Sequence, residues 1–401
     1  MIEQPVWPFG PYGDGVTERI EWATDVIRAR NGSQTKRQLA QRPRRTFDYE
    51  TVLTEQDRTF ASLLINDLGV SECVMPVWHD SQAVGPISAT HFNAGSGEFD
   101  DAVIACSTAG YDFFAGGLAV LLHKGRRLAL EILSVQSDGL TLADPIAALW
   151  PLGTKLAPAY ISTLSASSSE LGLTKRIGRV SLSFQIKADH SWPALTWDAY
   201  HIGLPVLTRR PLIGGGIQRS LVRDIVEIDV GVGPISRTDY PGRAFRSVAL
   251  EFLARDRASA GALRALVYGL RGRAGNVWVP TWASDLELSG TSSGTLLRVK
   301  WVGYALHGRQ QNSIRDIRIV LSSGVVLYRR IVASFDEAGV TERLTLNSAL
   351  PSPLSPGGAR LISFMSLSEA DSDRVEIQHP QSADKRTLTS ISFKAIKYEP
   401  T

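Results

Sequence analysis

Residues 74–80 of this 401-residue chain read VMPVWHD, and residues 278–285 read WVPTWASD. The two stretches share an apolar residue, a proline, one further residue and a tryptophan, in that order. Pro76 therefore matches Pro280, and Trp78 matches Trp282, at a spacing of about 200 residues. Self-similarity at a fixed spacing is the sequence signature of a repeated structural unit.

Further matches at a similar spacing flank this pair. They are LTL at 140–142 and 344–346, PRRTF at 43–47 against PGRAF at 241–245, and LSF at 182–184 against ISF at 391–393. The matches predict two tandem copies, residues 1–190 and residues 191–401. A duplicated unit of this size is more typical of an assembly component than of an enzyme with one active site.

Composition places the chain among globular proteins. It is 43% hydrophobic and 21% charged, and its net charge of +3 is too small to argue for nucleic-acid binding. No run of eighteen apolar residues predicts a membrane span, and the N-terminal residues do not resemble a signal peptide. Cys73 and Cys106 lie in apolar, strand-like runs, which favours two buried thiols and synthesis in a reducing cytoplasm.

Each copy is predicted to contain one helix among strands. Thr54 is expected to cap a helix that ends at Gly69, because acidic residues fill the first turn and apolar residues recur at helical spacing. A second helix is predicted from about Asp256 to Gly272. Residues 224–230, DIVEIDV, alternate polar and apolar side chains and predict a half-buried strand. The expected fold is α+β and mainly β, with a β-rich appendage in each copy.

Several stretches resemble one protein family, the distal-tail and tail-tip (baseplate) proteins of long-tailed bacteriophages. The likeness is best over residues 1–186 and weaker in the second copy. The stretches that carry it are ERIEWATDV at 18–26, RQLAQRPRRTF at 37–47, the helix with PVWHD at 76–80, LTLADP at 140–145 and PLGT at 151–154.

The resemblance implies two tandem copies of a tail-tube-like β-sandwich, each with one flanking helix. It also implies a virion structural protein that forms a ring at the distal end of the tail, after synthesis in the bacterial host cytoplasm. Such a ring joins the tail tube to the hub and tape measure proteins, and DNA passes through its lumen without specific binding. Two copies per chain would let a trimer present six similar units, and a hexamer stays open.

Arginine is concentrated just before the first predicted helix, at Arg37, Arg42, Arg44 and Arg45. This run could be a solvated loop, or an anchor that pairs with a carboxylate of a neighbouring subunit. DNA contact is less favoured, because a basic lumen would hold phosphates and hinder passage. Arg44, Arg45 and their counterpart Arg243 are the predicted subunit-interface residues.

The repeated proline and tryptophan residues are predicted to belong to the core. Trp78 and Trp282 each follow an apolar strand, with Pro76 and Pro280 two positions earlier. A tryptophan in this setting is more often packed inside a domain than used as a ligand platform.

Catalytic and metal-binding patterns are weak. His79 and Asp80 could form half of a triad, but the second copy has Ala283 and Ser284 there, and no Gly-x-Ser-x-Gly elbow occurs. The seven histidines show no metal-ligand spacing, and the acidic residues at 371–373 lack the rest of a calcium loop. No catalytic residue, metal or cofactor is expected.

A different class remains as the alternative, a carbohydrate- or receptor-binding adhesin of the tail tip. In that reading Trp150, Trp192 and Trp197 would stack on sugars. A hydrolase ranks third, because the sequence offers no set of nucleophile, base and acid.

Overall fold

A computed structural model describes residues 4–13, 15–93, 98–99, 102–165, 168–187, 192, 195–308, 314–380 and 386–397. The described chain is mainly β with a few helices, which confirms the expected fold class at that level. No helix in these ranges is long and apolar enough to cross a membrane.

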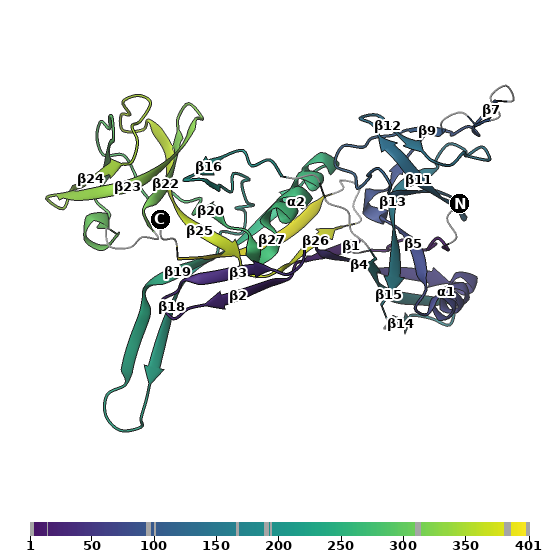
Figure 1. The fold of residues 1–401 in the computed structure, drawn as a ribbon, viewed down its shortest axis with the longest axis horizontal. Helices are drawn as coiled ribbons and strands as arrows, with labels where there is room; N and C mark the ends of the chain where they lie inside the picture. Colours follow the sequence, from purple (N-terminus) through teal and green to yellow (C-terminus); the bar gives the residue numbers. More distant parts are fainter. Residues whose placement is uncertain are drawn as a thin grey trace.

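The chain folds into two halves that lie side by side along the long axis of the molecule (Figure 1). The first contains β1 (Val16–Glu21), β2 (Thr24–Arg28), β3 (Gln34–Gln38), β4 (Arg44–Thr54), α1 (Glu55–Leu68), β5 (Glu72–Pro76), β6 (Gln82–Ala83), β7 (Phe92–Asn93), β8 (Glu98–Phe99), β9 (Ala102–Ala105), β10 (Leu118–His123), β11 (Arg126–Val135), β12 (Gly139–Leu142), β13 (Lys155–Leu164), β14 (Ser169–Gly172) and β15 (Ile177–Ile186). The second contains β16 (Tyr200–His201), β17 (Leu204–Pro205), β18 (Arg219–Ile228), β19 (Ser236–Ala254), α2 (Arg257–Leu270), β20 (Val277–Pro280), β21 (Leu296–Lys300), β22 (Asp316–Leu321), β23 (Val326–Glu337), β24 (Thr341–Leu346), β25 (Ala359–Ala370), β26 (Arg374–His379) and β27 (Thr387–Ala395).

One continuous antiparallel sheet runs through both halves. Its strands follow the order β14-β15-β4-β1-β26-β27-β19-β18. The joint between the halves is the pairing of β1 with β26, in which Glu18 lies opposite Ile377. Within the described residues β14 and β18 are the two outer strands of this order, at opposite ends of the sheet.

The same set of strand pairings occurs in each half. Strand β4 lies between β1 and β15 and leads into α1, and β19 lies between β18 and β27 and leads into α2. Likewise β13 pairs with β5, β10 and β15, whereas β25 pairs with β20, β22 and β27. Equivalent positions can therefore be read from the hydrogen-bonded register.

This register corrects one match made from the letters of the sequence. Arg45 lies opposite Ile20, and in the second half Arg246 lies opposite Leu221. The structural counterpart of Arg45 is thus Arg246, and Arg243 lies three residues earlier along β19. The difference arises because strand pairing, and not identity of single residues, fixes which positions are equivalent.

Both predicted helices are present, but their packing differs. Helix α1 begins after Thr54 and ends before Gly69, and α2 begins after Asp256, whose side chain caps the backbone N–H of Ser259. The apolar side chains of α2 are buried. In α1, however, Phe60 and Leu63 lie at the apolar helical spacing but are 46% and 63% exposed, so the predicted core face of this helix is partly wrong. Among the described residues, Phe9 meets the Phe60 ring edge to face at 6.0 Å and covers only part of that side of α1.

Strand β18 also departs from its prediction. Its alternating sequence indicated a half-buried strand, yet all ten residues are exposed. The outer part of the β18–β19 hairpin projects away from the rest of the molecule (Figure 1). A sequence pattern made for burial therefore lies on a surface that this chain does not cover.

The core of the second half contains residues of the first. Ile20 and Trp22, at the end of β1, pack with the buried side chains of α2, β19 and β27. The first half has its own core around Phe47, Phe184 and Trp7. Strand β1 and the β2–β3 hairpin belong to the first predicted copy, residues 1–190, but pack against the second half. They hold the two halves together.

Candidate functional site at the joint between the halves

A buried cluster of charged side chains lies where β1 and the turn at 78–80 meet β26 and α2. We call it the joint cluster. Its acidic members are Glu18, Asp80 and Asp112, and its basic members are Arg45, Arg257 and Arg264. Three negative and three positive groups balance one another, which is the condition under which buried charges are tolerated.

Glu18 lies at the centre of the joint cluster and is fully buried. Its carboxylate accepts hydrogen bonds from Arg45 Nε at 2.6 Å, Arg264 Nη2 at 3.1 Å and His379 Nε2 at 2.9 Å. Burial alone would raise the pKa of Glu18, but Arg264 and then Arg45 outweigh it and hold the pKa well below its usual range. Glu18 is therefore charged and joins strands of both halves.

Asp80 and Asp112 complete the pairing of the three arginines. Arg257 and Arg264, both on α2, contact the Asp80 carboxylate, the latter through Nη1 at 3.5 Å. Arg45 Nη2 lies 2.5 Å from Asp112 Oδ2. Each guanidinium thus meets a carboxylate from the first half, and α2 is held against the turn that carries Asp80.

Two histidines lie beside the acids. The rings of His79 and His379 stack with centroids 3.7 Å apart and planes 12° apart. Burial lowers the pKa of both side chains, and His379 lowers the pKa of His79 further. Glu18 raises the pKa of both rings but does not outweigh burial, so the net direction is downward for both. Both rings are neutral at pH 7, and Arg264 Nη2 donates to His79 Nε2 at 3.3 Å.

Glu18, His79 and His379 bring potential metal ligands within 4.8 Å of one another. The geometry argues against a metal ion here. An imidazole binds a metal through a lone pair in its ring plane, and two nearly parallel stacked rings cannot both direct that lone pair at one ion. Arg264 moreover already donates to Glu18 and His79. The cluster is therefore best explained as a structural contact.

The β2–β3 hairpin extends this contact along the second half. Glu369, fully buried at the end of β25, pairs with Arg28 at 2.9 Å and with Lys36 at 2.7 Å. Asp373 accepts hydrogen bonds from the backbone N–H of Thr24 and of Arg273. These acids hold the hairpin, and Asp373 is one of the acidic residues at 371–373.

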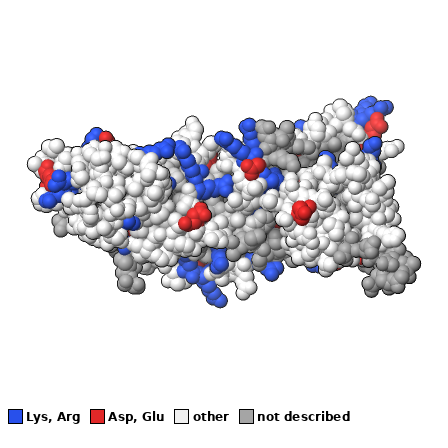
Figure 2. Space-filling model, turned by 90° about the horizontal axis from the view of Figure 1, so that it is seen from above, with Lys and Arg blue, Asp and Glu red and all other residues white. Residues whose placement is uncertain are grey.

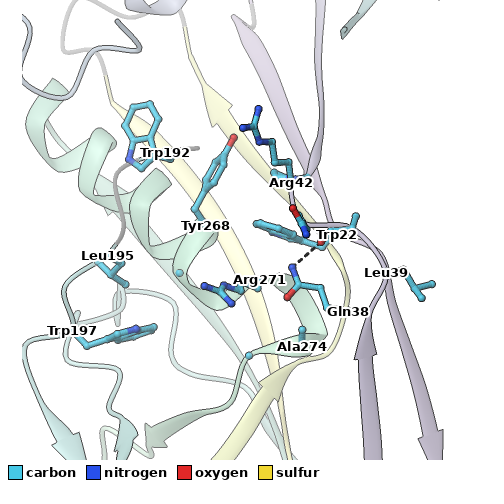
Figure 3. Close-up of a pocket in the computed structure, with 15 residues that line it drawn as sticks. Trp22, Gln38, Leu39, Arg42, Trp192, Leu195, Trp197, Tyr268, Arg271 and Ala274 are labelled. Carbon is cyan, nitrogen blue, oxygen red and sulfur yellow. Dashed lines mark hydrogen bonds between the residues drawn. The ribbon is translucent and has the colours of Figure 1, made fainter. Parts of the chain in front are cut away.

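A cavity of about 870 Å³ opens beside the joint, between β3, α2 and the side chains of Trp192, Leu195 and Trp197. Trp22 meets Tyr268 edge to face at 6.0 Å, and Trp192 lies 6.2 Å from Tyr268 (Figure 3). Arg42 and Trp197 also line this cavity. Aromatic faces with nearby guanidinium groups are suited to binding planar or sugar-like ligands.

The predicted subunit-interface residues have separate positions. Arg45 is buried inside the joint cluster, where it contacts Glu18, Asp112 and Tyr160 of its own half, so it cannot reach another subunit. Replacing it is expected to impair folding. Arg44 is exposed. Arg243 is buried beside Phe245, with its guanidinium 5.5 Å from the ring centre.

The predicted core residues are placed as follows. Pro76 and Pro280 are buried in β5 and β20. Trp78 and Trp282 are only half-buried, and each packs against the edge of its core. Trp150, expected on a sugar-binding loop in the alternative reading, is 1% exposed and belongs to the core of the appendage. It cannot stack on a sugar in this fold.

Sequence reasoning missed the joint cluster. His79 and Asp80 stood out only as half of a triad, and Glu18 not at all. Glu18 and Arg264 are 246 positions apart, so no local spacing connects them. One available signal was the charge of α2, whose arginines lie on a helix otherwise rich in apolar residues.

The outer surface differs in charge from the joint. On the face in Figure 2, lysine and arginine side chains gather over the middle of the molecule, and acidic groups appear only as isolated patches. Several carboxylates are buried instead, among them Glu18, Asp80 and Glu369. Basic side chains thus predominate on the face in Figure 2, and these buried carboxylates are paired with basic side chains.

Comparison with known proteins gives no identification. The chain matches no protein-family model and no curated protein sequence.

Proposed function

We propose that this chain is a virion structural protein that forms a ring at the distal end of a bacteriophage tail. The ring would join the tail tube to the tip proteins and leave a lumen for DNA. One observation carries the proposal, namely that both halves have the same strand pairings and are joined edge to edge by β1 and β26.

An edge-to-edge joint between similar units suits a ring. When the same contact joins each unit to the next, the units form a closed ring if the rotations between neighbours add up to a full turn. The free edges β14 and β18 would then be covered by neighbouring copies, as exposed sheet edges usually are. Three copies would supply six units, and the joint cluster would act as a rigid connection inside each chain.

The proposal predicts a defined assembly. Native mass spectrometry of concentrated purified protein should give a trimer of 43.7 kDa chains, or a hexamer if only one half of each chain lines the ring. Antibodies to the chain should label the tail tip of the parent virion by electron microscopy. Labelling along the whole tail, on the capsid, or nowhere on the virion would refute the proposal.

The aromatic cavity favours a second candidate function, carbohydrate or receptor binding at the tail tip. Trp192 and Trp197 line it, are only partly buried and offer stacking faces for sugars, beside the buried Trp22 and Tyr268. A glycan array with the intact protein tests this function. Binding that is lost in Trp197→Ala but kept in a Trp301→Ala control, which changes an exposed tryptophan elsewhere, would support it.

A further inference from the structure

We propose that the β18 edge and the β18–β19 hairpin of one copy dock on the β14 edge and the α1 side of the next copy. This inference rests on the proposed ring and names the surfaces that would form it. The partner is a second copy of this chain, bound head to tail.

Neither surface pairs with another strand at its outer edge within the described part of the chain: β14 pairs with β15, and β18 pairs with β19. Charged side chains on both surfaces do have partners in the same chain, since Arg219 donates to the Thr281 carbonyl and Arg58 pairs with Glu170. On β18 the side chains of Leu221 and Ile228 are 69% and 57% exposed, and the sequence alternates as in a covered strand. All of β14 is exposed, and Leu63 of α1 is 63% exposed. Unpaired sheet edges with exposed apolar side chains mark interaction sites.

The joint inside the chain is a template for this contact. By strand register, β18 occupies the place of β1, because Glu18 pairs with Phe47 on β4 while Arg219 pairs with Val248 on β19. Phe47 and Val248 are equivalent, since they lie opposite Phe184 and Phe393 in the matching strands β15 and β27.

Strand β14 occupies the place of β26 in the same way. Glu170 lies opposite Val180, and Ile377 lies opposite Thr389, at matching positions of β15 and β27. In the joint Glu18 faces Ile377. The equivalent contact between copies therefore places Arg219 opposite Glu170, with Ser220 opposite Ser169.

The hairpins extend the correspondence. Val26 pairs with Lys36 in the first half, and Glu227 pairs with Arg237 in the second, so Arg237 takes the place of Lys36. Lys36 binds Glu369 at 2.7 Å and Asn276 Oδ1 at 2.6 Å.

Asn276 has its own counterpart in the first half. Val277 lies opposite Ser368, and Cys73 lies opposite the equivalent Ser162. Asn276 precedes Val277, and Glu72 precedes Cys73. Asn276 and Glu72 are therefore also equivalent. In the single chain Glu72 pairs with Lys187 at 2.5 Å and has a side chain 27% exposed, and Arg237 pairs with Glu227 at 3.0 Å, so docking would exchange these surface pairs. Docking therefore brings Arg237 of one copy to Glu72 of the next.

The charge on the docking strand is reversed at one position relative to the joint. Arg219 takes the place of Glu18, and Glu170 takes the place of Ile377. Two basic groups of the docking hairpin, Arg219 and Arg237, are thus placed opposite the acidic Glu170 and Glu72. The contact between copies is complementary, and its polarity opposes pairing of either surface with the wrong half.

Disulfide trapping tests the register. In a Cys106→Ser background, one protein carries Ser220→Cys and a second carries Ser169→Cys, both changes on exposed positions. Mixing and mild oxidation should link the two proteins to each other, and neither should link to itself. A protein with Ser323→Cys in place of Ser220→Cys, on an exposed turn far along the second half, is the matched control.

Charge exchange tests the hairpin contact. Arg237→Glu and Glu72→Arg should each weaken self-association by about tenfold or more, and the double variant should recover most of that loss. Analytical ultracentrifugation measures the association, and circular dichroism checks that each variant folds. Lys300→Glu, which alters an exposed pair elsewhere, should leave association unchanged.

The outcomes separate this inference from the ring itself. Suppose that the normal protein assembles, but the Ser220→Cys and Ser169→Cys proteins do not link or the double variant does not recover association. Either result would overturn the docking mode and leave the ring standing. Self-linking of Ser220→Cys would show a symmetric contact and also overturn it. A protein that stays monomeric and unlinked at high concentration contradicts the docking mode, whereas virion labelling decides the ring separately.

Discussion

Glu18 provides a direct test of the joint cluster. Replacing it with glutamine keeps the size of the side chain and removes the charge that faces Arg45 at 2.6 Å and Arg264 at 3.1 Å. Two buried guanidinium groups would then share Asp80 and Asp112 as their remaining counter-charges. We expect Glu18→Gln to loosen the contact between the halves and to lower the stability of the whole chain.

The magnitude follows from the burial of the partners. Removing one member of a buried ion pair costs about 3–5 kcal/mol, because the other charge is left without compensation. Glu18, Arg45 and Arg264 are all essentially inaccessible to solvent. We therefore expect a loss near 4 kcal/mol in the free energy of unfolding. An exposed pair contributes only about 0–1 kcal/mol.

Urea unfolding followed by circular dichroism measures this difference, with the midpoint shift multiplied by the slope. Glu287→Gln is the matched control, because Glu287 pairs with Lys300 at 2.6 Å and both side chains are more than half exposed. A loss below 1 kcal/mol for Glu18→Gln, equal to that of the control, would refute the view that the cluster holds the halves together.

Three further predictions concern the same fold. As pH falls below about 6.5, the two histidines bind protons in the unfolded chain but not in the folded one, where His79 and His379 are buried. The free energy of unfolding should therefore fall by up to about 1.4 kcal/mol per pH unit for each histidine. Replacing both with glutamine should flatten the pH dependence of the urea midpoint. Gly110→Ala should lower the melting temperature more than Gly69→Ala, since both have positive φ but only at Gly110 would a Cβ collide with the α2 backbone; equal shifts would contradict this close approach. Trp278→Phe should cost about 1–3 kcal/mol in urea unfolding, because it leaves a buried carbonyl without its indole donor at 2.9 Å, and an unchanged midpoint would count against that bond.

Local features of the structure followed well from sequence. The predicted helices begin after Thr54 and Asp256, because capping and apolar spacing act over a few residues. The Asp256 side chain caps its helix, but the expected cap at Thr54 was wrong, since its side chain makes no capping hydrogen bond. The alternation at 224–230 correctly predicted a strand, but not its exposure. Burial depends on what covers a strand, and the covering surface is not encoded in the strand itself.

Positions in the candidate site were harder to predict. Arg45 was identified as a contact residue, but its partners Glu18 and Asp112 come from a distant strand and loop, so the sequence could not show that the contact lies within one chain. The match of Arg45 to Arg243 failed for a related reason. Equivalence between the halves depends on hydrogen-bonded register, which shifts relative to residue identity when hairpins contain irregular positions.

The sequence by itself determined the mainly β class, the two helices and the strands on either side of them, because capping, periodicity and turn chemistry act over a few residues. Only the tertiary structure decided that β1 pairs with β26, that Glu18 joins Arg45 to Arg264, and that β18 and β14 remain free edges. These contacts join residues from 27 to several hundred positions apart, far beyond the reach of a local pattern. Their energies depend on burial and on opposite charges meeting in space, which no local pattern specifies.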